Sequence, residues 1–401
     1  MARGNWIYFA REIPKLAAMD VPSPRPDAPH LADVVPAVLA AMGVTEAQRD
    51  GVHRPIDLPG GVRGACVLLI DGLGAQLLDT YADDAPVLAG LRGRNLRVGY
   101  PATTAAGLAA VGTGRRSGEH GMVGYSFRIP DHGVVNALRW TPHPFGADLR
   151  DVLVPEEVQP LPTTFGQATA AGVAVSVISG AEFTNSGLTR AVLRGGRYVG
   201  VHRLGDLAAR VQEAVADGGF CYGYHADLDM LGHLYGAGST AWRMQLRQVD
   251  RLVESIVEAL PAGGLLAVVA DHGMVNLTEA DVIDIDAHPE LLDGVLAVAG
   301  EARARHVYVA DGAADAVADG WRETLGAKAW VRTKEQAIAE GWFGTWVSDA
   351  ARSRIGDVVA AARDNAGLVR RTVEPLESAL IGQHGSWTDA EQLVPLLIAS
   401  G

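Results

Sequence analysis

The sequence is poor in cysteine and in long apolar runs. It has only two cysteines in 401 residues, Cys66 and Cys221, each inside a short apolar segment. This placement favours buried thiols in a reducing compartment over a disulfide. No uninterrupted stretch of about 18 apolar residues occurs, and charges interrupt the first 20 residues, so we expect neither a membrane span nor a signal peptide. The expected location is cytoplasmic.

Basic residues are also scarce. There are 34 Lys and Arg against 47 Asp and Glu, a formal net charge of −13. Nucleic-acid binding needs clustered positive charge, so we do not expect it. An acidic protein can still bind phosphate locally where metal ions supply the positive charge. The sequence is therefore compatible with a small phosphate-containing partner, and it leaves the oligomeric state open.

Short apolar runs alternate with longer helix-like segments over most of the chain. Because these runs are continuously apolar and bounded by Gly or Asp, they indicate strands buried on both faces of a sheet. The pattern predicts an α/β fold, a three-layer sandwich with a mainly parallel central sheet. Ligands of such sheets gather at the carboxyl ends of the strands. The four clearest runs cover residues 65–70, 172–179, 219–225 and 264–270.

The composition changes along the chain predict three parts. Residues 1–62 are an N-terminal lead-in that packs on the core, with one helix-like segment at 31–43. Residues 63–274 and 378–401 form the core, and 275–377 form a smaller inserted α+β cap. Within the cap, 306–344 predicts strand, helix, strand, helix, and 354–369 predicts one further strand.

Acids and histidines follow several of the apolar runs. Asp71 comes directly after the first run, and Asp271 and His272 come after the fourth. Alone, Asp71 fits a helix cap as well as a metal ligand. Asp229 and His233 are four residues apart, which places them on one helix face as a metal pair or a hydrogen-bonded pair.

His384 lies between two glycines after a short apolar segment, and alone it is more typical of a structural histidine. Taken together with one hydroxyl, however, the six residues supply seven oxygen or nitrogen ligands. Such a set suits two divalent ions, with imidazole and carboxylate together favouring Zn, Mn or Fe over Ca.

The order of the motifs resembles the alkaline phosphatase superfamily, and most closely its type I phosphodiesterase/nucleotide pyrophosphatase branch. The resemblance covers about residues 63–275 and 376–401. It is carried by IDGLG, PATTAAGLAAVGTG, GEHGMVG, DLDMLGH, ADHGM and GQHG.

The resemblance implies two metal sites and a nucleophile. Thr104 matches the nucleophile in preference to Thr103, because only that register also matches Pro101, Thr113 and Gly114. The first metal would be held by Asp71, Thr104, Asp271 and His272. The second would be held by Asp229, His233 and His384.

The implied activity is hydrolysis of phosphodiester or pyrophosphate bonds through a covalent phosphothreonine intermediate. The cofactors would be two divalent ions, with Zn expected first and Mn or Fe as alternatives, and the substrate a small phosphate ester or nucleotide. A phosphomonoesterase, a phosphonate hydrolase and an inactive metal-binding homologue are alternatives. The resemblance also implies an Asn contacting phosphate three positions after the nucleophile. This chain has Gly107 there, so the substrate preference stays open.

Overall fold

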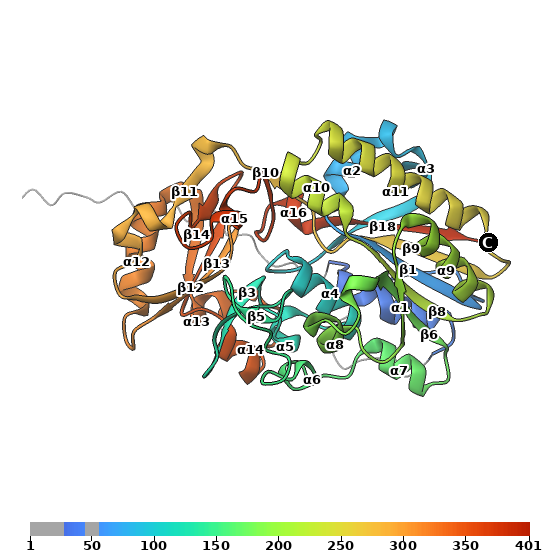
Figure 1. Cartoon of the computed structure of the whole chain (residues 1–401), viewed down its shortest axis with the longest axis horizontal. Helices are drawn as coiled ribbons and strands as arrows, with labels where there is room; N and C mark the ends of the chain where they lie inside the picture. The colour runs from blue at the N-terminus through green and yellow to red at the C-terminus, as the bar shows by residue number, and fades with distance from the viewer. Residues whose placement is uncertain (1–27, 45–55) are drawn as a thin grey trace, which may run out of the picture.

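The computed structural model describes residues 28–44 and 56–401 (Figure 1). The remainder of the predicted lead-in, 1–27 and 45–55, lies outside the described residues. The core is built on a seven-stranded sheet with the order β2-β18-β9-β1-β8-β6-β7. In that order the strands are β2 (Arg92–Arg97), β18 (Leu393–Ser400), β9 (Gly264–Val269), β1 (Gly64–Ile70), β8 (Phe220–His225), β6 (Val175–Gly180) and β7 (Arg197–Val201).

The four predicted apolar runs are β1, β6, β8 and β9, and each pairs in parallel with its neighbours among them. Every residue of β1 and β9 is buried, because helices cover both faces of the sheet. Only β18 runs antiparallel, to β9 on one side and to β2 on the other. The predicted α/β class with a mainly parallel central sheet is therefore confirmed.

Two groups of helices form the outer layers. α9 (Leu204–Ala216) and α11 (Thr240–Glu258) pack together on one face, and α1 (Val34–Ala41), α4 (Thr104–Thr113) and α7 (Thr164–Ala170) pack together on the other (Figure 1). The predicted helix at 31–43 is found as α1 with a preceding 3-10 turn. Among the described residues, no helix combines the length and the apolar character needed to cross a lipid bilayer.

Helix α4 differs from the surface helices because all ten of its residues are buried. Its Ala, Gly and Val residues are small, which allows close contact with neighbours on every side. The helix ends at Gly114, whose φ of 58° is the left-handed conformation common after a helix. The small residues after the two threonines are thus the interior of a fully enclosed helix.

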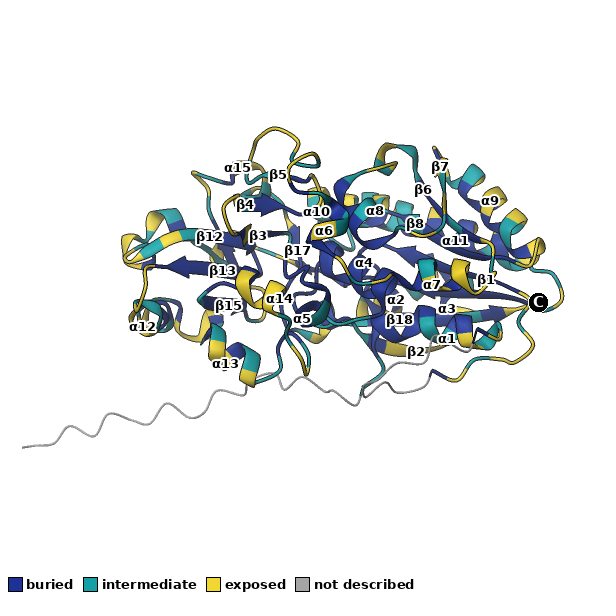
Figure 2. Ribbon diagram, turned by 90° about the horizontal axis from the view of Figure 1, so that it is seen from below, coloured by how far each residue is buried: buried dark blue, intermediate teal, exposed yellow. Residues whose placement is uncertain are grey.

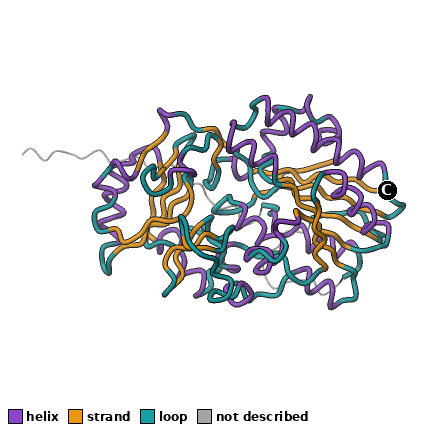
Figure 3. The backbone as a smooth tube through the Cα atoms, in the orientation of Figure 1, coloured by secondary structure: helices purple, strands orange, loops and turns teal. Residues whose placement is uncertain are grey.

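A separate sheet lies beside the core, with the antiparallel order β12-β13-β15-β14 (Figure 3). These strands are β12 (Val295–Glu301), β13 (Ala304–Val309), β15 (Val358–Ala362) and β14 (Ala329–Thr333). Together with α12 (Ala314–Leu325) and α13 (Lys334–Ala339), they give the predicted strand, helix, strand, helix order. The single strand predicted at 354–369 is instead two, β15 and β16 (Gly367–Val369). The boundaries at 275 and 377 stay predictions.

A small three-stranded sheet connects the two parts, made of β3 (Ser126–Ile129), β4 (Gly133–Asn136) and β5 (Thr141–Pro142). The Ser126 hydroxyl lies 2.9 Å from the backbone nitrogen of Gly300, from which it accepts a hydrogen bond. Residues along β3 and β13 are largely buried where the parts meet (Figure 2). These contacts place the end of β12 next to the core.

The two cysteines lie opposite each other on paired strands, Cys66 on β1 and Cys221 on β8. Both are buried and both are free thiols. The structure therefore agrees with the prediction of buried thiols, which lie side by side on the two central strands.

Candidate metal centre and active site

Three predicted site residues lie at the carboxyl ends of two neighbouring strands. Asp71 directly follows β1, and Asp271 and His272 lie just beyond β9, which pairs with β1 in parallel. Parallel strands end at the same edge of the sheet, which brings the three side chains together. One ligand atom from each lies within 4.8 Å of the others, and all three residues are buried.

Two further predicted residues lie on helix α10 (Asp227–Tyr235), which follows β8. Asp229 and His233 are one turn apart, and His233 Nε2 is 3.2 Å from Asp229 Oδ2. The strand β17 (Gly382–Gln383) then delivers His384 from the far end of the chain. Its Nε2 lies 3.3 Å from His233 Nε2. The three side chains form a second cluster.

His272 joins the two clusters. Asp229, His272 and His384 also offer ligand atoms within 4.8 Å of one another. The rings of His272 and His384 are stacked, with centroids 3.5 Å apart and an interplanar angle of 13°. The structure thus brings all six predicted acids and histidines into one continuous site.

Thr104 completes the site as the first residue of α4. Its Oγ1 lies 3.2 Å from His272 Nε2. Thr103 precedes it as the extended N-cap residue, with φ −140° and ψ 151°. The first turn of a helix has free backbone N–H groups that can hold an anion. The hydroxyl directed at the cluster is therefore that of Thr104, beside an anion-binding helix start.

The three histidine rings are oriented by backbone carbonyls. Each Nδ1 lies within hydrogen-bonding distance of a carbonyl oxygen and donates to it, so in the neutral ring each Nε2 carries a lone pair. The Nδ1 to oxygen distances are 2.7 Å for His233 to Gly382, 3.0 Å for His272 to Gly273 and 2.9 Å for His384 to Ala102. Three lone pairs thus converge on the cluster. The tautomer with the proton on Nδ1 is the one that a metal bound at Nε2 requires.

The carboxylates are also arranged as metal ligands would be. One buried oxygen of each accepts no hydrogen bond, namely Asp71 Oδ1, Asp229 Oδ1 and Asp271 Oδ2. The other oxygen of Asp71 is held by the Tyr224 hydroxyl. Burial raises the pKa of Asp271 well above its usual range, and the charge of Asp71 raises it further. Buried carboxylates need compensating positive charge, so this donor set fits divalent cations bound by oxygen and nitrogen.

A cavity of about 350 Å³ opens beside the cluster, between the core and the cap. The cap residues that line this cavity could not be predicted from the sequence, because they belong to no recognisable motif. Its lining includes Thr103, Thr104, Tyr125, Arg139, Asp229, His233, Glu301, Arg305, Glu374, Glu377 and His384. A second cavity of about 510 Å³ lies against Ala106 and Ala110 of α4 and is lined by none of the predicted site residues. The smaller cavity is therefore the candidate substrate site.

Gly107 faces away from that cavity. A Cβ atom at this position would lie 2.5 Å from Asp271 Cβ and 3.1 Å from Asp271 Cα. An Asn side chain could not be accommodated there without moving Asp271. Position 107 thus packs against the cluster, and the substrate preference that Gly107 left open stays open.

Comparison with known proteins relates this geometry to a family. The family model described as type I phosphodiesterase/nucleotide pyrophosphatase matches residues 65–387. No curated protein matches the sequence. Murine ectonucleotide pyrophosphatase/phosphodiesterase 5 has a similar structure, with a TM-score of 0.65 and 16% identity over 84% of this chain and 88% of that chain.

An inactive variant of the same murine protein, solved in complex with AMP, has a TM-score of 0.63 at 16% identity, with the same coverage. Phosphonoacetate hydrolase from Sinorhizobium meliloti 1021, in complex with phosphonoformate, has a TM-score of 0.63 and 19% identity over 88% of this chain and 92% of that chain. These likenesses show an alkaline-phosphatase-like fold. The family and the clusters support a metal-dependent phosphoester hydrolase. Because the family match spans well over half of its length, this chain belongs to the type I phosphodiesterase/nucleotide pyrophosphatase family.

Proposed function

We propose that this protein hydrolyses phosphodiester or pyrophosphate bonds on a two-metal centre, through a covalent phosphothreonine intermediate on Thr104. The observation that carries the proposal is the 3.2 Å distance between Thr104 Oγ1 and His272 Nε2. His272 belongs to both clusters of candidate ligands. A hydroxyl at that junction lies next to candidate ligands of both proposed ions.

The proposed ligands divide as the resemblance implies. Asp71, Thr104, Asp271 and His272 would hold one ion, and Asp229, His233 and His384 the other. Zn is the first choice, with Mn and Fe as alternatives, because the set mixes imidazole and carboxylate. When bound, two such ions would supply Lewis acidity that lowers the pKa of a hydroxyl and stabilises charge on a leaving oxygen.

The chain's own groups account for the covalent steps. The Thr104 oxygen forms a bond to phosphorus as the bond from phosphorus to the leaving oxygen breaks, and the hydroxyl proton ends on the released alcohol. Water then cleaves the bond between Thr104 and phosphorus, which restores the hydroxyl. The product released from a diester substrate is a phosphomonoester that keeps the second ester group. Backbone N–H groups at the start of α4 can hold a phosphoryl oxygen during both steps.

The test compares two neighbouring threonines. With bis(4-nitrophenyl) phosphate as substrate, we expect Thr104→Ala to lower kcat by roughly 1000-fold or more, since it removes the nucleophile. Thr103→Ala is the matched control, because Thr103 lines the same cavity whereas the hydroxyl beside His272 belongs to Thr104, and it should retain most activity. Metal content measured by mass spectrometry should be similar in all three proteins. Near-normal turnover by Thr104→Ala would refute the proposal.

A phosphonate hydrolase is the second candidate function. It is supported by the structural similarity to a phosphonoacetate hydrolase and by Arg139, an exposed cation on the cavity wall that forms no ion pair with the described residues. Relative kcat/KM values for a diester, a monoester and a carboxylated phosphonate separate the candidates. A strong preference for the phosphonate would replace the first proposal.

A further inference from the structure

Two glutamates of the cap line the same cavity as Thr104. Glu301 is the last residue of β12, and Glu377 lies in the short helix α15 (Pro375–Ser378). Each has one buried carboxylate oxygen that lacks a hydrogen bond of good geometry from the described residues, Oε1 of Glu301 and Oε2 of Glu377. The Thr103 side chain is the nearest donor to Glu301, and it lowers the pKa of Glu301 only in part against burial. Unpartnered buried oxygens are costly, which indicates that a ligand group completes them.

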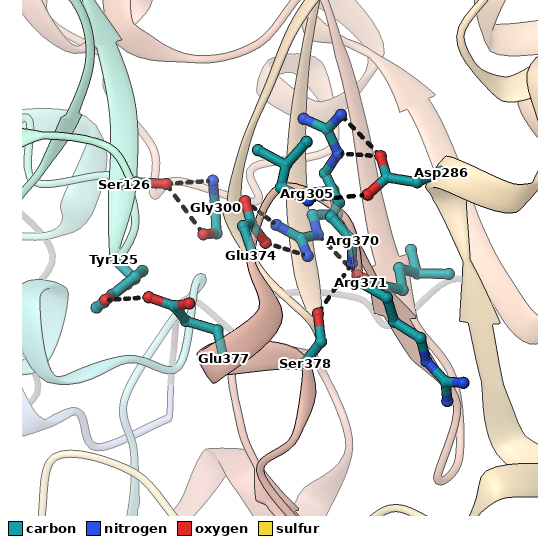
Figure 4. Close-up of polar contacts among 12 residues, drawn as sticks. Tyr125, Ser126, Asp286, Gly300, Arg305, Arg370, Arg371, Glu374, Glu377 and Ser378 are labelled. Carbon is teal, nitrogen blue, oxygen red and sulfur yellow. Dashed lines mark hydrogen bonds and ion pairs between the residues drawn. The ribbon is translucent and has the colours of Figure 1, made fainter. Parts of the chain in front are cut away.

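Tyr125 ties the two carboxylates together. Its backbone nitrogen donates to Glu301 Oε2 at 2.8 Å. Its hydroxyl donates to Glu377 Oε1 at 3.2 Å, as Figure 4 shows. The second oxygen of each carboxylate is thus fixed, while the first is left for another donor. We call these three residues the acidic wall.

The other charges around the cavity are arranged differently. Arg305 and Glu374 form a buried ion pair with 2.8 Å between Nη2 and Oε2 (Figure 4). Glu374 also contacts His143. These charges satisfy one another. Arg139 is exposed, where water and salt weaken its field. Glu301 and Glu377 form no ion pair with any described residue, although the charge of Arg305 acts on Glu301 from a distance.

We propose that the acidic wall is the subsite for one alcohol group of the substrate, and that it takes an ammonium on a short aliphatic chain. The substrates would then be aminoalkyl phosphodiesters. This inference rests on the proposed phosphodiesterase function. An ammonium supplies both the missing hydrogen-bond donors and the missing positive charge. A carboxylate or terminal phosphate in this position would face two acids.

The apolar part of the cavity fits the same substrate. Leu138, Met230 and Leu234 line it and are 37%, 56% and 49% exposed. They offer contact area to an aliphatic stem. Burial also raises the pKa of Glu301 to about 8, so a cation bound beside this carboxyl group would favour its ionised form at neutral pH.

The inference can be tested with three 4-nitrophenyl phosphodiesters that differ only in the second alcohol: 2-aminoethyl, n-propyl and carboxymethyl. We expect kcat/KM for the aminoethyl ester to exceed that for the propyl ester by roughly 10- to 100-fold, the usual value of a charged hydrogen bond. The carboxymethyl ester should be the poorest substrate. The readout is the ratio of kcat/KM for the aminoethyl ester to kcat/KM for the propyl ester. A purely structural role of the acidic wall would not change this ratio.

Charge-removing variants assign the effect to the wall. Glu377→Gln and Glu301→Gln keep an oxygen that accepts from Tyr125, and each should lower the ratio by about tenfold. Glu323→Gln, an exposed position on α12, is the matched control and should leave the ratio unchanged. A ratio near one in the wild type, or an unchanged ratio in both wall variants, would overturn the inference while the phosphodiesterase proposal stands. A preference for the carboxymethyl ester that Arg139→Gln abolishes would also overturn it.

A binding measurement separates this inference from the activity. Calorimetry should show tighter binding of 2-aminoethylphosphonate than of propylphosphonate to the metal-loaded protein. If that selectivity is present and no ester is hydrolysed, the proposed function fails and the subsite stands. If neither turnover nor selectivity is found, both fail.

Discussion

Gly107 gives the sharpest prediction about the active site. It lies one turn after Thr104 in α4, and an added Cβ would meet Asp271 Cβ at 2.5 Å. Carbon atoms in contact are normally separated by about 3.5 Å or more, so Gly107→Ala requires a movement of about 1 Å. Both α4 and Asp271 are fully enclosed, so neither can move freely. The displacement must therefore reach the cluster.

The size of the effect follows from that displacement. Overpacking of a buried site costs about 1–3 kcal/mol of unfolding free energy. A shift of about 1 Å in a group that positions the reacting atoms costs roughly 100-fold in rate. We expect Gly107→Ala to lower kcat/KM for a nitrophenyl phosphodiester by about that factor and to weaken metal binding.

The assay is kcat/KM titrated against Zn or Mn, together with urea unfolding. Gly320→Ala is the matched control, because Gly320 is also inside a helix but a Cβ there meets nothing within 4 Å. That control should gain about 0.4–1 kcal/mol in stability with unchanged activity. Wild-type activity and metal affinity in Gly107→Ala would refute the packing argument.

Three further predictions concern stability, metal and thiols. Burial opposes ionisation of Glu374, but Arg305 and His143 outweigh it and lower its pKa to about 2. A carboxyl with a lowered pKa stabilises the fold above its unfolded pKa of about 4.3 and loses that contribution as the pH falls towards 2. Glu374→Gln should therefore lower the free energy of unfolding by about 3–5 kcal/mol at pH 7. Urea unfolding should also show that the variant loses less stability than the wild type between these pH values. An unchanged dependence of stability on pH in this range would contradict the prediction. Dialysis against a chelator should abolish activity and lower Tm, both restored by Zn or Mn, because the ions compensate the buried carboxylates; full activity after complete metal removal would disprove it. Cys66 and Cys221 should react with a thiol reagent only after unfolding, and rapid labelling of the native protein would contradict their burial.

The sequence was sufficient to predict most of the cluster of acids and histidines, because its members share a local signal. Asp71, Asp271 and His272 each follow a continuously apolar strand, and parallel strands end at one edge. Asp229 and His233 share a helical spacing. His384 lacked such a signal, and its assignment depended on the motif order of the family.

The substrate cavity could not be predicted in this way. Tyr125, Glu301 and Glu377 come from three separate segments, and no local pattern relates them. Their meeting depends on how β3 packs against β12, which is a tertiary contact. Gly107 shows the same limit, because its neighbour Asp271 is 164 positions away in the sequence. Spacing within α4 contains no information about that neighbour.

The division of the site between core and cap has a physical consequence. All six acids and histidines of the cluster come from the core or from the segment after the cap, whereas Glu301, Arg305, Glu374 and Glu377 come from the cap. Metal affinity depends on the geometry of the first set, and selection among alcohol groups depends on the charges of the second. Because the two sets come from different parts of the chain, charge changes in the acidic wall should alter the ratio of kcat/KM between substrates without altering the metal content. The substrate selectivity set by the cap and the metal-binding geometry set by the core can therefore change independently of each other.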